Sequence, residues 1–356
     1  MRAWVEVDLG ALCRNAAAVA RHSNVPLLPM VKADAYGLGA VRVARALDGL
    51  REVWGFGVAT VGEGEELRAA GIARPVVVFT PLRAADLDAA ERLDLTPALG
   101  EWSTIERWAS TRRPWHLAID TGMNRAGLGW RDVAKLEALL RRSPPAAAFT
   151  HFHSAELDDG SMEEQEERFR SALAALPARP ELLHAENSAA AARRSPSAWD
   201  LVRPGIFLYG VGSGGAAGIA PEPVASVRAR IVEVRTVSDG EGVSYDATWR
   251  ARGTRRVATV PVGYADGYRR ALGNRARAAV RGRFVPVAGV VTMDMTMLDV
   301  TDCPCAVDDV VTLIGRDGDA ELPLGDVAAA GEISPYELLT GLRQRLPRRY
   351  VGEEGA

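Results

Sequence analysis

Apolar runs of strand length alternate with amphipathic, helix-like stretches between residue 25 and about residue 210. Helical periodicity is clear over 64–71 and 163–176, where apolar residues recur on one face of a helix. The eight candidate strands are 26–31, 53–59, 76–80, 93–98, 115–120, 146–152, 181–184 and 201–209. Strands that alternate with helices pair in parallel, and eight such units close into a barrel. We therefore predict an α/β chain with an N-terminal (β/α)8 TIM-type barrel.

A different pattern begins after Tyr209. The segment 210–218 is rich in glycine and predicts a turn-rich bridge. Beyond it, apolar and polar residues alternate with a period of two, which is typical of strands with one buried face. The candidate strands there are 227–237, 256–262, 278–291 and 310–314, separated by turn signals such as Ser238-Asp239-Gly240 and Arg316-Asp317-Gly318. A serine cap followed by proline at Ser334-Pro335 predicts one late helix.

A length of 356 residues suits two domains, or one large barrel with an appendage, and 47% hydrophobic residues are enough for full cores. The division that we predict follows the change of pattern. Residues 9–222 would form the (β/α)8 barrel and residues 223–356 a mainly-β domain, joined by an N-terminal strand over residues 1–8.

Composition excludes several classes of function. The net charge of −3 and the lack of a basic run argue against nucleic acid or a membrane surface as a partner. The segment from Met1 to Asp8 carries acids where a signal peptide needs an apolar core, and no apolar stretch approaches membrane length. Cys13, Cys303 and Cys305 are too few and wrongly spaced for a disulfide framework or a zinc site. We expect a soluble, cytoplasmic protein with reduced thiols and no bound metal.

Lysine occurs only twice among the 43 basic residues, and the other 41 are arginines. Arginine stays protonated in proteins, whereas a desolvated lysine can lose its proton and act as a nucleophile or base. Lys135 follows a helical polar and apolar rhythm and is interpreted as a surface residue. Lys32 follows the apolar run 26–31 and precedes a glycine-containing turn, where an amine can face a pocket. We predict Schiff-base or general-base chemistry for Lys32.

Other polar residues gather at the C-terminal ends of the predicted strands, which is the rim that carries the chemistry of such barrels. Lys32 ends strand one, 120–125 leave strand five, and His151 ends strand six. Asn187-Ser188 follow strand seven, and 203–206 lie in strand eight. The sequence therefore places reactive groups on one rim although they are spread over most of the barrel.

Each of these residues also has a simpler interpretation when it is taken alone. Ser188 could cap a helix, Gly205 could serve a tight bend, and His151 could be a hydrogen-bonded core histidine. Together, however, a serine hydroxyl at a helix N-terminus and the backbone N–H groups near Gly205 could cradle a phosphate. A reactive lysine across the barrel from a phosphate cup suggests pyridoxal 5′-phosphate.

These residues also carry a family resemblance. The chain resembles the alanine racemases, fold-type III pyridoxal-phosphate enzymes, over essentially its whole length. The eight matching motifs, all in family order, are Arg2–Leu12, Val31–Gly37, Asp120–Arg125, Asn187–Ala190, Val202–Ile206, Val243–Tyr245, Gly263–Gly267 and Met293-Asp294. The resemblance implies interconversion of L-alanine and D-alanine, which supplies D-alanine for bacterial cell-wall peptidoglycan.

The resemblance implies a two-base mechanism. Lys32 would carry the cofactor covalently and then act as the base on one face of the substrate Cα, with Tyr245 on the other face. Inversion by proton transfer is easiest with one acid/base group on each side of a planar centre. A tyrosine has an ordinary pKa near 10, so Tyr245 would need cationic neighbours or hydrogen bonds to act as a base.

The resemblance also assigns residues around the cofactor and the substrate. Arg203 would lie at the pyridine nitrogen, oriented by His184, with His151 against the ring. The implied phosphate contacts are Tyr36, Ser188, Gly205, Ile206 and Tyr336. The residues implied at the substrate are Arg125 and the main chain of Met293 at its carboxylate, Tyr264 at the entrance, and the supporting residues Asn187 and Asp294. In the family the β domain of one subunit completes the site of the other, so we expect a head-to-tail homodimer.

Three positions depart from the family pattern. Ala118 stands where many members have a lysine that is carbamylated and supports the substrate-binding arginine. We expect a bound anion such as chloride, or Asn124, to support Arg125 instead. Asp34 replaces the usual asparagine, and Thr292 stands where many members have cysteine.

Four alternatives remain at this stage. A serine or broad-specificity amino-acid racemase would use the same residues, and the crowding by Tyr245 and Tyr264 favours alanine over it. A fold-type III amino-acid decarboxylase would carry an acidic residue at the pyridine nitrogen, where this chain has Arg203. A non-catalytic pyridoxal-phosphate-binding barrel would lack the β domain. A purely structural protein would leave the lysine pattern and the order of the motifs unexplained.

Overall fold

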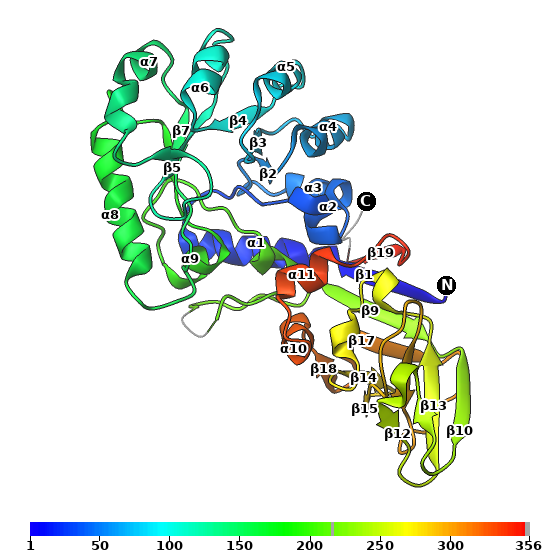
Figure 1. Ribbon diagram of the computed structural model, residues 1–356. Coiled ribbons are helices and arrows are strands. Elements are labelled where there is room, and N and C mark those ends of the chain that lie inside the picture. The colour runs from blue at the N-terminus through cyan, green and yellow to red at the C-terminus, as the bar shows by residue number, and fades with distance from the viewer. Residues whose placement is uncertain (215–216, 353–356) are drawn as a thin grey trace.

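The computed structural model describes residues 1–214 and 217–352, which form a barrel and a mainly-β part side by side (Figure 1). The predicted glycine-rich bridge includes residues 215–216, and the predicted β domain includes 353–356. Both of these stretches lie outside the described residues. No helix within the described ranges is long and apolar enough to cross a membrane.

Six parallel strands form the continuous part of the barrel sheet, in the order β2-β3-β4-β5-β7-β8. They are β2 (Phe56–Val58), β3 (Val76–Val78), β4 (Thr96–Leu99), β5 (His116–Asp120), β7 (Ala147–Phe149) and β8 (Leu182–His184); β6 (Leu128–Gly129) pairs with β5 beside this path. Leu27 pairs in parallel with both Val53 and Val202, so the first and eighth segments meet and complete the barrel. The predicted barrel class is confirmed.

The eighth predicted strand, 201–209, is mostly wrong. Only Val202 forms a β-bridge there, and Ile206–Tyr209 form the short 3-10 helix η2. Pro204 has no N–H group for a sheet ladder, so the strand cannot continue through it. The four residues of η2 are nevertheless all buried. Their apolar character reflects burial in the core. A short apolar run indicates burial but does not distinguish a strand from a helix.

Helices follow the barrel strands and cover the sheet (Figure 1). They are α1 (Leu9–Ser23), α2 (Lys32–Gly37), α3 (Ala40–Asp48), α4 (Val61–Ala69), α5 (Ala84–Arg92), α6 (Trp102–Ala109), η1 (Val133–Leu136), α7 (Glu137–Arg142), α8 (Ser161–Ala174) and α9 (Ser188–Arg193). The helical stretches expected over 64–71 and 163–176 correspond to α4 and α8. The expected alternation began only at residue 25 and so missed α1, although Asp8 caps its first turn by accepting a hydrogen bond from Ala11 N.

The second part holds two sheets and a hairpin. The larger sheet has the order β15-β14-β17-β9-β1-β19, with β18 paired to β17, and the smaller has the order β10-β13-β16. The strands are β1 (Ala3–Asp8), β9 (Ala225–Arg230), β10 (Glu233–Val237), β11 (Gly242–Val243), β12 (Trp249–Arg250), β13 (Arg255–Val260), β14 (Arg277–Val280), β15 (Arg283–Pro286), β16 (Thr296–Asp299), β17 (Val310–Asp317), β18 (Ala320–Leu322) and β19 (Arg348–Val351). The helical turns are η3 (Tyr245–Ala247), η4 (Tyr264–Asp266), η5 (Arg270–Leu272), α10 (Leu324–Ala330) and α11 (Pro335–Thr340).

The mainly-β class is confirmed, with corrections in detail. The predicted strand 227–237 is two strands in different sheets, and 278–291 begins with a hairpin that turns at Arg281 and Gly282, both with positive φ. Two late helices occur rather than one. The second begins as predicted, because the Ser334 hydroxyl accepts a hydrogen bond from Tyr336 N.

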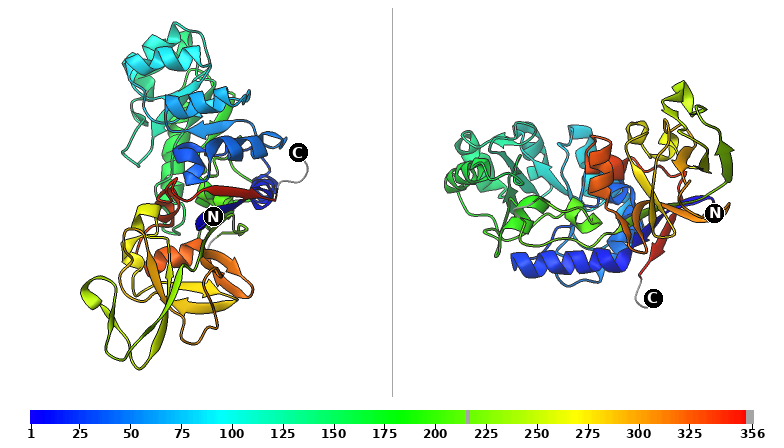
Figure 2. Two further views of the ribbon diagram at one scale, coloured as in Figure 1. Left: turned by 90° about the vertical axis from the view of Figure 1, so that its right-hand side faces the viewer. Right: turned by 90° about the horizontal axis from the view of Figure 1, so that it is seen from below.

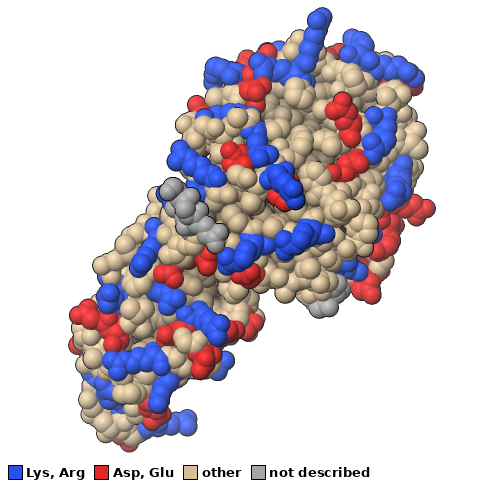
Figure 3. Space-filling model, turned by 180° about the vertical axis from the view of Figure 1, so that it is seen from behind, with Lys and Arg blue, Asp and Glu red and all other residues tan. Residues whose placement is uncertain are grey.

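The two ends of the described chain meet in the larger sheet. Strand β1 pairs antiparallel with β9 and parallel with β19, so the N-terminal and C-terminal strands are neighbours (Figure 2). Val5 and Val7 of β1 are fully buried in a hydrophobic cluster that also contains barrel residues such as Leu12 and Val43. The barrel and the sheets therefore share one core. Basic and acidic side chains are mixed over the face shown in Figure 3.

Candidate active site

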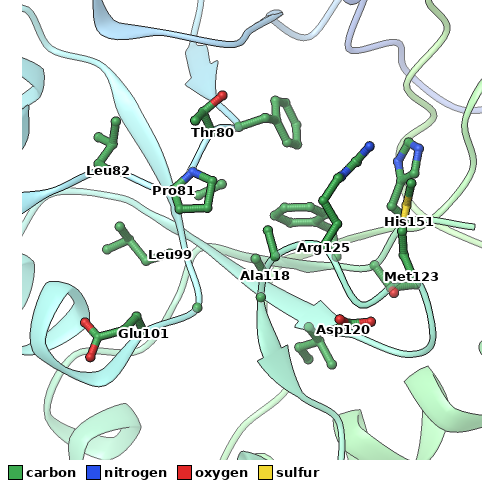
Figure 4. A pocket seen from close by; sticks show the side chains of 18 of the residues that line it. Thr80, Pro81, Leu82, Leu99, Glu101, Ala118, Asp120, Met123, Arg125 and His151 are labelled. Atoms are coloured by element: carbon green, nitrogen blue, oxygen red, sulfur yellow. The ribbon is translucent and has the colours of Figure 1, made fainter.

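A cavity of about 560 Å³ opens at the C-terminal ends of the barrel strands (Figure 4). Its walls come from the segments that follow β3, β4, β5 and β7, and Lys32 and His151 both line it. All of its lining residues lie between positions 32 and 151. The rim that sequence analysis selected for chemistry is therefore hollow, as a site for a small molecule requires.

Lys32 begins a left-handed turn rather than ending a strand. The last paired residue before it is Met30, which bridges Gly57. Residues 33–36 have φ angles between 51° and 57°, and none of them is glycine. Each such residue costs roughly 1–2 kcal/mol in this conformation. Contacts from other parts of the fold must therefore hold this turn in place.

Two carboxylates stabilise the turn, one at its start and one that joins it to the first residue of α3. Glu63 Oε1 accepts a hydrogen bond of 2.8 Å from Ala33 N, and Asp34 Oδ1 accepts one of 2.7 Å from Ala40 N. Glu63 also closes a capping box at the start of α4. Sequence analysis missed Glu63, although its place three residues after Thr60 is the signature of a capping box.

The environment of Lys32 favours the neutral amine. Burial lowers the pKa of Lys32, and the nearby cations Arg125 and Arg203 lower it further, whereas Glu63 acts in the opposite direction. A neutral amine is the nucleophilic form of lysine. The position is thus suited to the covalent chemistry predicted for it.

Arg203 is the buried centre of the other half of the rim, with 3% of its surface exposed. Its Nη1 donates to His184 Nδ1 at 2.8 Å, and its Nη2 donates to the carbonyls of Thr150 at 2.8 Å and Ala185 at 3.0 Å. Its Nη2 also lies 3.3 Å from His151 Nδ1. Among the described residues, Arg203 has no salt bridge and its Nε–H has no acceptor. Burial lowers the pKa of Arg203 to about 9, which leaves a cation at neutral pH.

These contacts fix the tautomers of three histidines. His184 accepts from Arg203 at Nδ1, so its proton is on Nε2, which donates to His116 Nδ1 at 3.1 Å. Burial, with the charge of Arg203 second, lowers the pKa of His116 and of His151 to about 3 and holds the pKa of His184 well below its ordinary value. All three rings are therefore neutral.

Sequence analysis missed His116. The available signal was the period of two in β5, which puts His116 on the same face as Ala118 and Asp120. Its contact with His184 joins two strands that β7 separates in the sheet, and a single sequence does not reveal such a contact.

The predicted phosphate residues come together from four parts of the chain. Asn187 caps α9 by accepting from Ala189 N and Ala190 N, so the helix does not need Ser188 as its cap. The Ser188 hydroxyl instead accepts from Gly205 N at 2.8 Å. A Cβ atom at position 205 would collide with the Tyr36 hydroxyl, so glycine is required there.

Two tyrosine rings complete this cluster. The Tyr336 ring, carried by α11, lies 6.2 Å from the Tyr36 ring, measured between centroids. The backbone N–H of Ile206, at the start of η2, has no acceptor in the described part of the chain. Hydroxyl groups and backbone N–H donors around one small volume are the ligands that a phosphate prefers.

Arg125 is exposed on the loop after β5 and makes no hydrogen bond or salt bridge with the described residues. Asn124, one of its two predicted supports, donates from Nδ2 to Gly122 O at 3.1 Å, and its side chain makes no hydrogen bond to Arg125 in the described part of the chain. That expectation is wrong, because the amide closes the local turn that Asp120 also holds. Ala118 and Arg125 both line the cavity. A bound anion beside Arg125 stays a prediction.

The predicted residues of the β part lie apart from this cavity. Tyr245, Tyr264 and Met293 are 69%, 39% and 53% exposed, and none of them lines it. Tyr264 and Met293 are on adjoining loops, since Tyr264 N donates to Thr292 O and Ala265 N donates to Met293 O, both at 3.0 Å.

Further contacts brace the Met293 loop. Asp294 Oδ1 accepts from Arg345 at 2.8 Å, and Arg345 also pairs with the buried Asp266 at 3.2 Å. The N–H of Met293 has no acceptor among the described residues and is open to a ligand. No group of three or more His, Cys, Asp or Glu side chains in residues 1–214 and 217–352 could hold a metal ion.

Comparisons with known proteins cover the whole fold. The family model of the alanine racemase N-terminal domain matches residues 7–213, and that of the C-terminal domain matches residues 224–350. The alanine racemase of Symbiobacterium thermophilum is 38% identical over 371 residues, which cover 98% of this chain and 97% of that protein. The alanine racemase of Deinococcus radiodurans is 38% identical over 352 residues, which cover 98% of this chain and 99% of that protein.

Solved structures agree with the family models. Alanine racemase from the D-cycloserine-producing Streptomyces lavendulae superposes with a TM-score of 0.92 at 29% identity, covering 99% of this chain and 98% of that chain. Alanine racemase from Bartonella henselae, solved with covalently bound pyridoxal phosphate, superposes with a TM-score of 0.91 at 29% identity, covering 99% of this chain and 100% of that chain. The match to both family models and the identity to full-length relatives show that this chain belongs to the alanine racemase family.

Proposed function

We propose that this chain interconverts L-alanine and D-alanine with pyridoxal 5′-phosphate and supplies D-alanine for bacterial cell-wall peptidoglycan. The observation that carries the proposal is the pairing of two groups on one rim. Lys32 is an amine with a lowered pKa, and Arg203 is a buried cation without a salt bridge among the described residues. The covalently bound cofactor of the Bartonella relative supports the same chemistry here.

The residues present fit the cofactor at three points. Ser188, Gly205 and Ile206, with the hydroxyls of Tyr36 and Tyr336, would hold the phosphate. Arg203 would donate its free Nε–H to the ring nitrogen, and His151 would lie against the ring. The Lys32 amine would attach to the aldehyde. When bound, the cofactor supplies an electron-withdrawing ring that makes the Cα–H of the attached amino acid acidic.

Two side chains would then move the protons. Lys32 takes the Cα proton on one face or supplies one there, and Tyr245 does the same on the opposite face. Placing one acid/base group on each face lets the Cα lose a proton on one side and gain one on the other. The configuration is thereby inverted.

Arg203 would also direct the choice of reaction. A guanidinium donates a hydrogen bond and, because it is cationic, disfavours protonation of the ring nitrogen. By keeping that nitrogen unprotonated, Arg203 would weaken the electron withdrawal that the cofactor supplies, which would favour racemisation over transamination or β-elimination. A decarboxylase of this fold type would need an acidic residue at this position. The contacts of Arg203 with His184 and two carbonyls argue against that alternative.

We propose a head-to-tail homodimer in which the β part of one subunit completes the site of the other. Exposure of Tyr245, Tyr264 and Met293, which all lie away from the cavity, supports this arrangement. In the dimer Tyr245 would face Lys32 of the partner subunit, and Tyr264 would narrow the entrance. The free N–H of Met293, held in place through Asp294, would donate to the substrate carboxylate together with Arg125.

The same residues could racemise serine, so the catalytic groups alone do not distinguish the two substrates. The preference for alanine would come from the smaller pocket that Tyr245 and Tyr264 leave. We also propose the cytoplasm as the site of action. The three cysteines, Cys13, Cys303 and Cys305, are free thiols, as is usual in a reducing compartment.

The Lys32→Ala variant should produce no D-alanine from L-alanine, because it lacks both the attachment point and one base. The measurement is chiral chromatography after incubation of cofactor-loaded protein with L-alanine, with L-serine in a parallel reaction. Lys135→Ala is the matched control and should keep full activity, since Lys135 is an exposed lysine paired with Asp132. Undiminished D-alanine production by Lys32→Ala would refute the role of Lys32.

The lowered pKa of Lys32 predicts its pH-dependent reactivity in the cofactor-free protein. A lysine with a lowered pKa becomes neutral at lower pH, so acylation by a neutral reagent should reach half its maximal rate below pH ~10.4, the ordinary value. Mass spectrometry can follow both lysines in one sample, with Lys135 as internal reference. Arg125→Gln should move the Lys32 midpoint upward, because a nearby cation is lost. A Lys32 midpoint at or above that of Lys135 would contradict the inferred environment.

The dimer proposal predicts complementation between two inactive variants. Lys32→Ala and Tyr245→Ala each remove a residue from every site of their own homodimers. A mixed dimer would have one site that lacks both residues and one intact site. Subunit exchange should therefore restore about half of the wild-type activity per mixed dimer, assayed as D-alanine formation. Exchange that is verified by native mass spectrometry but restores no activity would show that each subunit builds its site alone.

A further inference from the structure

The guanidinium of Arg348, at the start of β19, is fully occupied by backbone carbonyls. Its Nε and Nη2 donate to Gly37 O at 3.0 Å and 2.7 Å, and Nη2 also donates to Leu342 O at 2.8 Å. Its Nη1 donates to Arg343 O at 2.6 Å and Leu346 O at 2.7 Å. One side chain thus joins the turn that begins at Lys32 to the chain segment before β19.

Gly37 is the last residue of that left-handed turn, with φ of 87°. The C-terminal part of the chain also meets the turn at two further points. Tyr350 donates its hydroxyl hydrogen bond to Leu38 O at 3.0 Å. A Cβ atom at position 37 would lie 3.1 Å from Leu339 O of α11. Figure 1 shows β19 and α11 beside α2, far from it in sequence.

The turn separates two residues with different proposed roles at the cofactor. Lys32 stands at its start, and Tyr36, near its end, belongs to the phosphate cluster. Glu63 holds the start of the turn through Ala33 N. Arg348 holds its end. Because residues 33–36 all have an unfavourable backbone conformation, release of one end would let the turn relax and change the spacing between the amine and the phosphate cluster.

We propose that Arg348 is a positioning residue, whose bidentate contact with Gly37 O sets where the Lys32 amine stands relative to the phosphate cluster. The inference rests on the proposed role of Lys32. Among the described residues, Arg348 makes no hydrogen bond to Lys32 or Tyr36, so it acts through the backbone of the turn. A lysine cannot replace it, because an ammonium group has three donors where Arg348 makes five hydrogen bonds.

Arg74 provides a matched control. Its partly buried guanidinium also holds a turn, through the backbone carbonyls of Asp48, Leu50 and Val53 and through the Asp48 carboxylate at 2.9 Å. That turn precedes β2, at the opposite end of the barrel from the cavity. Loss of Arg74 should therefore cost stability without moving Lys32.

The experiment compares Arg348→Ala and Arg348→Lys with Arg74→Ala and Arg74→Lys. Each variant is freed of cofactor, its melting temperature is recorded, and pyridoxal phosphate is titrated back. Borohydride then fixes the bound cofactor, and mass spectrometry locates the modified lysine. We expect both Arg348 variants to bind the cofactor at least about tenfold more weakly than wild type, the effect of losing charge-assisted hydrogen bonds. The Arg74 variants should bind pyridoxal phosphate as tightly as wild type does, although their melting temperature falls by about as much as that of the Arg348 variants.

Guanidinium ion at millimolar concentration should partly restore cofactor binding to Arg348→Ala and should leave Arg74→Ala unchanged. Should Arg348→Ala not fold, the comparison of Arg348→Lys with Arg74→Lys carries the test. The proposal would be overturned if the Arg348 and Arg74 variants showed the same relation between lost cofactor affinity and lost melting temperature. If the cofactor fixed in the wild-type protein were found on Lys135, or on no lysine, the proposed role of Lys32 itself would be refuted.

Discussion

The site depends on the buried guanidinium of Arg203, which forms no salt bridge with any residue in the described ranges. Burying an unpaired charge is costly unless every donor finds an acceptor. Arg203 meets most of this condition: its Nη1 donates to His184 Nδ1 and its Nη2 to the carbonyls of Thr150 and Ala185, while its Nε–H has no acceptor among the described residues. Because the histidine must accept there, it must be neutral. Burial is the main cause of the lowered pKa of both Lys32 and His184, and the charge of Arg203 lowers both further.

A second constraint is the left-handed turn that carries Lys32. Its backbone is unfavourable by itself, so its shape depends on contacts from Glu63 and from the C-terminal segment. That segment belongs to the sheet in which β1 and β19 are neighbours. The mainly-β part therefore does more than carry Tyr245 and Met293. It also shapes the barrel loop that holds the amine.

Much of this fold was predictable because periodicity reports burial directly. The alternation of strands and helices gave the barrel, and the scarcity of lysine pointed to Lys32. The left-handed turn was not predictable, since only Asp34 among Ala33 to Tyr36 belongs to a residue type that tolerates positive φ without tertiary contacts. His116 and Arg348 were missed for the same reason: their roles are contacts between segments far apart in sequence. The prediction of the eighth strand was wrong beyond Pro204, because the apolar run that follows forms a short 3-10 helix.

If Arg203 donates to the cofactor ring nitrogen, that nitrogen should carry no proton. The holoenzyme can be reconstituted with pyridoxal phosphate carrying ¹⁵N in the ring and studied by NMR at neutral pH. We expect the chemical shift of an unprotonated nitrogen in the wild-type protein and that of a protonated nitrogen in Arg203→Glu. A protonated nitrogen in the wild-type protein would contradict the role assigned to the buried guanidinium.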